Sequence, residues 1–279
     1  MIKTIDVKSG ETAGLYQYLS AAVTPRPIAF VSTIDAEGNK NLSPFSFFNV
    51  FSVNPPILVF SPVRRVRNNT SKHTLDNVHQ VKECVISLVT EEIAQQVSLA
   101  SCDFDSATNE FEKAGFTEVK SDLITPSRIK ESPINFECKV NEIITLGEEG
   151  GAGSLVLCEI LKMHIDTEVL DENNAIDPFK LNIVSRLGAN WYGKTTKESL
   201  YEIAKPISRM GMGIDNLPEE IRNSSILTGN ELAILASAEN IPEKKEFSFR
   251  DKKSTAEKHI LAKELLSQEK AGDAWQILL

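Results

Sequence analysis

Short apolar runs separated by turn residues dominate the first two thirds of the chain. Residues 27–34, 56–61 and 84–89 are rich in the β-branched and aromatic types that pack well on a pleated sheet. After the first run, residues 35–39 supply Asp, Gly and Asn, which tolerate a positive φ, so a hairpin turn should lead into a new strand near Lys40. The pattern predicts a mainly β core.

Two longer strand-like segments, residues 134–146 and 154–165, are joined by the glycine-rich stretch 147–153, which predicts a long hairpin. Strands of about ten residues suit a barrel, because antiparallel neighbours must tilt and still pair. Residues 70–82 place apolar side chains at a spacing of three, which predicts an amphipathic helix. We expect a Greek-key-like β-barrel of about six antiparallel strands with flanking helices.

The pattern changes after about residue 195. Residues 198–204, 229–238 and 254–269 have helical periodicity and are separated by prolines. We therefore expect two domains, a barrel over residues 1–197 and a helical C-terminal extension over residues 198–279.

Composition and charge narrow the possible partners. The 279 residues are 41% hydrophobic and 25% charged, as in ordinary globular proteins. A formal net charge of −9 disfavours broad binding to nucleic acid or anionic lipid, which needs a concentrated basic surface. No stretch approaches the roughly 20 apolar residues of a membrane span, and the first residues lack a secretory signal, so we expect a cytoplasmic protein.

Neither the cysteines nor the histidines predict a metal site. The four cysteines are far apart and form no Cys-x-x-Cys pair, so buried reduced thiols are expected. The four histidines show no ligand spacing, and His164, near the end of a strand-like run, is interpreted as a structural histidine. Fingerprints for acyl transfer, for P-loops and for dinucleotide-binding Rossmann folds are missing from the sequence.

Three stretches in close order carry a family resemblance: Thr-Pro-Arg-Pro-Ile-Ala-Phe-Val-Ser-Thr at 24–33, Asn-Leu-Ser-Pro-Phe-Ser-Phe-Phe-Asn at 41–49 and Asn-Pro-Pro-Ile-Leu-Val-Phe at 54–60. Together they resemble the flavin reductase-like family of FMN-binding split β-barrels, which includes flavoredoxin, over about residues 13–192. The resemblance implies FMN as cofactor, a homodimer with FMN at the subunit interface, and hydride transfer from NAD(P)H to flavin and then to an acceptor.

The segment Ser43 to Phe47 is the candidate for the flavin ring. A flat ring with a polar edge needs an apolar wall with hydroxyl and backbone donors beside it, and Ser-Pro-Phe-Ser-Phe offers both. A hairpin strand whose phenylalanines are core residues is the alternative, because aromatic clusters usually serve packing.

The segment 61–74 is the most basic run of this acidic chain and is the candidate for the phosphate. It leads into the predicted helix, whose N-terminal N–H groups and dipole favour an anion. Lys72 and Thr74 offer donors, with Asn77 one turn further on, although a surface loop with a helix cap uses the same residue types. The resemblance implies a Lys-Asp-Thr triplet followed by Asn here, and His73 replaces the Asp.

Two later segments match the family more loosely. Residues 109–117 resemble an acidic-Phe and Gly-x-Thr segment near the flavin pocket, and without the family they predict a helix ending at a glycine. Residues 185–192 resemble an Arg-Leu-Gly then Tyr segment, so Arg186 is expected near the flavin or in an ion pair, and Tyr192 near the ring edge. The predicted flavin-binding residues are Arg26, Ser43, Pro44, Phe45, Ser46, Phe47, Ser61, Pro62, Lys72, Thr74, Asn77, Arg186 and Tyr192.

The functional hypothesis is therefore an FMN-dependent oxidoreductase whose acceptor is free flavin, a partner enzyme or another small molecule. The alternative is a non-catalytic FMN protein, acting as a sensor or electron relay, whose helical tail binds a partner. A third reading is a flavin-dependent enzyme for a specific organic substrate. No residue that would read the ribose of NADH or NADPH can be assigned from the sequence.

Overall fold

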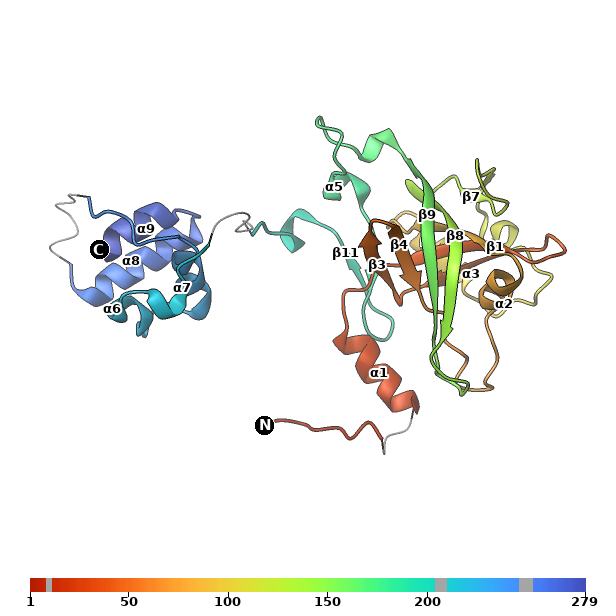
Figure 1. Ribbon diagram of the computed structural model, residues 1–279, viewed down its shortest axis with the longest axis horizontal. Coiled ribbons are helices and arrows are strands. Elements are labelled where there is room, and N and C mark those ends of the chain that lie inside the picture. Colours follow the sequence, from red (N-terminus) through yellow and green to blue (C-terminus); the bar gives the residue numbers. More distant parts are fainter. Residues whose placement is uncertain (9–11, 204–209, 246–252) are drawn as a thin grey trace. The chain divides into compact units, whose positions relative to one another are not determined.

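The computed structural model describes residues 1–8, 12–203, 210–245 and 253–279 (Figure 1). The chain divides into two compact units, Met1–Tyr201 and Glu202–Leu279, each with its own hydrophobic core. Among the described residues, no helix is both long enough and apolar enough to cross a lipid bilayer.

The first unit is built on one antiparallel sheet of seven strands with the order β2-β1-β5-β8-β9-β4-β3. The long β8–β9 hairpin, green in Figure 1, runs through the middle of this order, as residues 134–165 predict. The prediction of about six strands was low by one, because β3 follows β2 after only two residues and no turn signal separates them. The strands are β1 Ala29–Ile34, β2 Lys40–Phe45, β3 Phe48–Val53, β4 Pro56–Phe60, β5 Glu83–Leu88, β8 Ile134–Thr145 and β9 Ser154–Ile165.

The sheet is rolled, because its two edge strands are neighbours in the chain. β2 and β3 lie at opposite ends of the strand order, yet only Ser46 and Phe47 separate them. Three peptide steps span at most about 11 Å, so the two edges must meet at this corner, which we call the seam. In the described residues no strand pairing joins β2 to β3, so the structure is an open roll split at the seam and not a closed barrel.

Alternation along the strands fills two cores. Val31 and Phe45 point into the roll, whereas Phe30 and Leu42 point outward and pack under helices α3 and α4. The helices of this unit are α1 Thr12–Ala22, α2 His73–Gln80, α3 Ala94–Ala100, α4 Glu110–Ala114 and α5 Pro178–Leu181, with 3-10 turns at Thr167–Val169 and Lys197–Ser199. Two small sheets complete it, formed by β6 Glu118–Val119 with β7 Arg128–Ile129, and by β10 Val184–Arg186 with β11 Tyr192–Lys194.

The local predictions in this unit are largely confirmed. The turn at 35–39 has Gly38 at a φ of +88°, and the amphipathic helix forms as α2, a few residues shorter than expected. Gly115 ends α4 in the left-handed conformation with a φ of +71°. Three cysteines are buried free thiols in the core of the roll, whereas Cys102 is exposed, contrary to expectation.

The second unit is a small helical bundle, as the periodicity predicts. It contains a 3-10 turn at Ile214–Asn216 and the helices α6 Glu219–Arg222, α7 Gly229–Ala236, α8 Thr255–Ser267 and α9 Ala271–Leu278. Trp275 anchors α9 in this core and donates its indole N–H to the carbonyl of Leu235 at 3.3 Å.

The predicted helix at 198–204 is wrong for its described part. Only the 3-10 turn at Lys197–Ser199 forms, and residue 204 lies outside the described residues. The Ser199 hydroxyl accepts from the backbone N–H of Thr196 and donates to the carbonyl of the same residue, which favours a local turn over a helix.

Candidate functional site

A cavity of about 290 Å³ lies at the seam of the rolled sheet, and we call it the seam cleft. Its walls come from α1, from the seam and from residues 61–72, the basic loop between β4 and α2. The backbone N–H of Ser61 donates to the carbonyl of Phe47 at 2.8 Å, which ties the seam to the start of the basic loop. The lining residues are Tyr16, Pro44, Phe45, Ser46, Phe47, Ser61, Val63, Arg64, Arg65, Val66 and Lys72.

One face of the seam cleft is aromatic. The rings of Tyr16 and Phe47 lie 6.3 Å apart, and those of Phe45 and Phe60 lie 5.3 Å apart. Phe45 is buried in the core, which is the alternative noted from the sequence, while its neighbours at the seam remain half-exposed. The seam therefore combines an apolar wall with hydroxyl groups, which is the composition of a site for a flat heteroaromatic ligand.

Arg26 fastens the seam from behind. Its guanidinium donates to the carbonyls of Ser20, Val23 (2.6 Å) and Leu187 (3.2 Å), and its Nε lies 3.4 Å from the hydroxyl of Ser46. The same group lies 5.7 Å from the ring centre of Phe47. Because Arg26 is buried and four of its five N–H donors are occupied, its place in the structure is that of a clamp for the seam.

The two adjacent arginines of the basic loop are also committed to the protein. Arg64 donates to the side chain and the carbonyl of Asn69, both at 2.6 Å, and closes the loop on itself. Arg65 donates to Thr70, to the carbonyl of Ser71 and to the carboxylate of Asp103. These bonds fix the shape of the loop. Asp103 is the one negatively charged partner among them, so the loop keeps a net positive charge.

The β8–β9 turn supports the basic loop from its outer side. Arg64 N–H donates to the carbonyl of Ala152 at 2.9 Å, and the Gly151 N–H donates back to the carbonyl of Arg64 at 3.0 Å. A side chain at Gly150 would lie 3.0 to 3.2 Å from backbone atoms of Arg65 and Val66, so glycine permits this close approach. The glycine-rich stretch, predicted to be only a hairpin turn, therefore also positions the wall of the cleft.

Lys72 stands apart from the other cations of the loop. Within the described residues, its ammonium makes no hydrogen bond or ion pair. Burial lowers the pKa of this ammonium below its usual range, and the nearby guanidinium of Arg65 lowers it further. An anion in the seam cleft would satisfy this charge.

The N-terminus of α2 adds backbone donors beside Lys72. Lys72 occupies the N-cap position without a capping side chain, and its carbonyl accepts from Leu75 and Asp76. The backbone N–H groups of His73 and Thr74 have no acceptor in the described part of the chain. An unpaired ammonium next to two open N–H groups is an arrangement suited to a phosphate.

The structure brings only some of the predicted site residues together. Pro44, Phe45, Ser46, Phe47, Ser61 and Lys72 line the seam cleft, and Arg26 lies directly behind it. Asn77 instead donates to Thr33 of β1 at 3.1 Å, and the Thr74 hydroxyl faces Asn41 of β2. Both lie on the buried face of α2, so of Thr74 only the backbone N–H faces outward from the helix start. Pro62 is buried, and Ser43 lies within β2 opposite Val31.

Arg186 and Tyr192 lie on the β10–β11 hairpin and do not line the seam cleft. Arg186 pairs through its backbone with Arg26 and donates to the carbonyl of Trp191, and its guanidinium lies 4.6 Å from the ring centre of Tyr192. The hairpin therefore contacts the seam indirectly, through Arg26. Glu110, in the other loosely matched segment, accepts from the backbone N–H of Leu42 and supports β2 from outside the roll.

Sequence reasoning missed several lining residues. Tyr16 was missed because its approach to Phe47 depends on how α1 packs, which no local pattern encodes. Val63, Arg64, Arg65 and Val66 lie in the predicted basic segment, and the clustering of its charges is the signal that would have found them.

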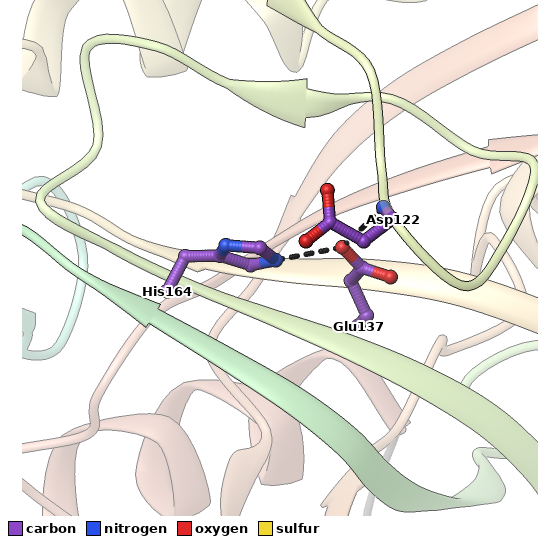
Figure 2. A group of neighbouring side chains, drawn as sticks. All are labelled: Asp122, Glu137 and His164. Atoms are coloured by element: carbon purple, nitrogen blue, oxygen red, sulfur yellow. Dashed lines mark hydrogen bonds and ion pairs between the residues drawn. The ribbon is translucent and has the colours of Figure 1, made fainter.

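A second polar cluster lies away from the cleft. Figure 2 shows Asp122, Glu137 and His164 pointing toward one another, and their ligand atoms lie within 4.8 Å. Glu137 is fully buried, both of its oxygens accept backbone N–H groups, and His164 Nε2 lies 2.7 Å away. Asp122 is paired with Lys162, and Arg128 Nε lies 3.8 Å from Glu137. Both oxygens of Glu137 and one of Asp122 are occupied and each carboxylate has a cation beside it, so the cluster fits an internal ion network in which His164 serves Glu137.

The contacts around Glu137 determine the pKa of its carboxyl group. Burial alone would raise the pKa of Glu137, but the two backbone N–H groups and His164 outweigh it and hold the pKa below its usual range. Glu137 therefore stays ionised and fixes the loop that starts at Asp122.

Comparisons with known proteins agree with this architecture. A family model described as a flavin reductase like domain matches residues 21–181. An uncharacterized protein from Aquifex aeolicus is 36% identical over 192 residues, which are 69% of this chain and 95% of that protein. The Bacillus subtilis protein YwrF is 33% identical over 186 residues, covering 66% of this chain and 90% of its own.

Solved structures extend the likeness to three dimensions. Nitrilotriacetate monooxygenase component B from Bacillus cereus is 26% identical with a TM-score of 0.68, covering 73% of this chain and 99% of its own. The 2-nitrobenzoate 2-nitroreductase NbaA from Pseudomonas fluorescens is 29% identical with a TM-score of 0.66, covering 76% and 100%. A protein with a split barrel domain from Shewanella frigidimarina is 24% identical with a TM-score of 0.60, covering 71% of this chain and 96% of its own. The chain therefore belongs to the flavin reductase-like family, and its first unit has that family's split-barrel fold.

Proposed function

We propose that the seam cleft binds FMN and that the protein is an FMN-dependent oxidoreductase. The unpaired ammonium of Lys72 beside the open N–H groups at the start of α2 is the observation that carries the proposal. An unsatisfied cation is costly unless an anion joins it, and a phosphate monoester supplies one. The aromatic and hydroxyl-bearing seam next to it suits the isoalloxazine ring.

The chemistry is that of the flavin, which accepts a hydride from NAD(P)H and passes electrons on to free flavin or another small acceptor. The residues of this chain would bind and orient it. Lys72, Ser61 and the start of α2 would hold the phosphate, and the seam would hold the ring while Arg26 keeps the seam in place. The likeness to a nitroreductase supports a small organic molecule as one such acceptor.

We further propose that two copies share the site. The cleft of one chain, about 290 Å³, is at the lower limit of the roughly 300–1,000 Å³ of small-molecule sites, so a second surface would be needed to enclose FMN. The edge strand β3, which starts at the seam, exposes Val50 (56%), Phe51 (70%) and Val53 (86%). An exposed apolar edge strand is a template for pairing with another chain, here a second copy.

The test compares two lysines at opposite ends of α2. Lys72→Gln should raise the Kd for FMN, measured by fluorescence titration, by about tenfold or more, because a charge-assisted hydrogen bond contributes about 1.5–3 kcal/mol. The control Lys82→Gln removes an exposed lysine at the far end of the helix and should leave the Kd unchanged. Equal effects of both variants, or a wild-type protein that takes up no flavin, would refute the FMN site.

A second candidate function rests on the helical unit. We propose residues 1–197 as the flavin domain and residues 198–279 as an extension, whose independent core also suits a partner-binding element on a non-catalytic FMN protein. Steady-state oxidation of NADH and NADPH, with added FMN and a range of acceptors, separates the two functions. Turnover excludes the passive protein, and no turnover with any acceptor excludes the oxidoreductase.

A further inference from the structure

A second cavity of about 490 Å³, shallow and open to solvent, lies at the basic loop. It shares Arg65, Val66 and Lys72 with the seam cleft, so the two cavities have a common wall. Arg67 from the loop, with Ser101 and Asp103 from the segment after α3, completes its lining.

This cavity is positive within an acidic protein. Three cations face it against the single carboxylate of Asp103, a local charge of +2 in a chain whose net charge is −9. Asp103 accepts from both Arg65, at 2.7 Å, and Arg67. Lys72, which lines this cavity too, has no partner among the described residues. One carboxylate therefore orients two guanidiniums without balancing the charge of the cavity.

Arg67 retains donors for a ligand. Its side chain is 70% exposed and contacts the carboxylate of Asp103 through one terminal nitrogen, whereas a guanidinium has five N–H donors. The backbone that carries it is fixed, because Gly150 packs against Val66. Arg67 is thus fixed at the edge of the second cavity with N–H donors still free, and these suit a dianionic phosphate.

We propose that the second cavity binds a phosphate of the nicotinamide nucleotide that reduces the flavin. The inference rests on the proposed function, since it requires FMN in the seam cleft. A hydride donor must place its nicotinamide at the flavin ring, while its phosphates must leave the apolar seam. The shared wall brings a positive cavity next to that path. With Lys72 taken by the FMN phosphate, the two guanidiniums against Asp103 still leave a charge of +1 for a 2′-phosphate or a diphosphate.

The experiment changes Arg67 alone, because Lys72 also serves the proposed FMN site. With FMN saturating, Arg67→Ala should raise the KM for the donor by about tenfold, and Arg67→Glu should raise it further, as expected for a lost charge-assisted contact to phosphate. The Kd for FMN should stay within about twofold of wild type. Lys162→Ala, which removes another ion-paired surface cation, is the matched control and should leave both constants unchanged.

Two supporting outcomes identify the phosphate. A rise in KM for NADPH alone assigns the 2′-phosphate, and equal rises for NADPH and NADH assign the diphosphate. Unchanged KM values for both donors, or a loss of FMN binding in Arg67→Ala, would overturn the inference.

Calorimetric titration of the FMN-loaded protein with NADP⁺ and NAD⁺ requires no turnover. Weaker binding to Arg67→Ala supports the site even if the oxidoreductase proposal fails, and no binding to the wild type overturns it.

Discussion

Replacement of Gly150 by alanine tests whether the β8–β9 turn positions the basic loop. The added methyl carbon would lie 3.0 Å from the carbonyl oxygen of Val66, 3.1 Å from its Cα and 3.2 Å from the carbonyl oxygen of Arg65. Contacts between such atoms are normally about 3.5 Å, so the loop backbone must move by roughly 0.4 Å. The φ of Gly150 is not positive, so alanine adds no backbone strain of its own.

The displaced residues both line the seam cleft, so the cost should appear in flavin binding. Overpacking of this kind costs about 1–3 kcal/mol, and if about 1 kcal/mol of it reaches the site, the Kd for FMN rises about fivefold. The assay is fluorescence titration of FMN, with the thermal midpoint measured in parallel. Gly229→Ala is the control, because an added methyl group there meets nothing within 4 Å. An FMN Kd equal to wild type in Gly150→Ala would refute the positioning role of the turn.

Three further predictions follow from buried or desolvated groups. Glu137→Gln should lower the free energy of unfolding, measured by urea titration, by about 3 kcal/mol, because it replaces one buried acceptor by a donor facing N–H groups. The control Glu131→Gln, at a partly exposed carboxylate that also accepts a backbone N–H, should cost less than about 1 kcal/mol. FMN binding favours the charged form of Lys72, whose pKa is already lowered in the free protein. Affinity should therefore be full below the pKa of Lys72 in the free protein and fall as the pH rises from there through the pKa of the complex, and Lys72→Gln should lack this fall. Ellman's reagent should titrate one thiol, Cys102, in the native protein and all four after unfolding. The other three thiols are buried, and burial also raises the pKa of the Cys158 thiol. Rapid reaction of more than one thiol in the native protein would contradict the packing.

Local sequence features determined most of the elements but not their assembly. The turn at 35–39 was predictable because Asp35 accepts the N–H groups of Glu37 and Asn39 within the turn itself. The seam was not, since nothing local indicates that β2 and β3 lie at opposite edges of the sheet. Its two residues carry no turn signal, and only the rolled topology makes them a corner.

The candidate site shows the same division. The basic loop could be found from its charge, but which of its cations is free depends on Asn69 and Asp103, partners that tertiary structure supplies. The orientation of α2 likewise turned Asn77 toward β1, because its apolar neighbours Leu75 and Val78 take the core side of the same helix.

The seam also has a consequence for how the chain reaches its native state. β2 and β3 each pair with a sequence neighbour, β1 and β4, but these two hairpins are brought to opposite margins of one sheet only when β5, β8 and β9 pair between them. The corner at Ser46 and Phe47 therefore takes its final shape through non-local strand pairings, and such contacts slow folding. Cutting the chain at this joint should leave both hairpins paired but remove the covalent link that shapes the cleft, so the sheet should survive while ligand affinity falls.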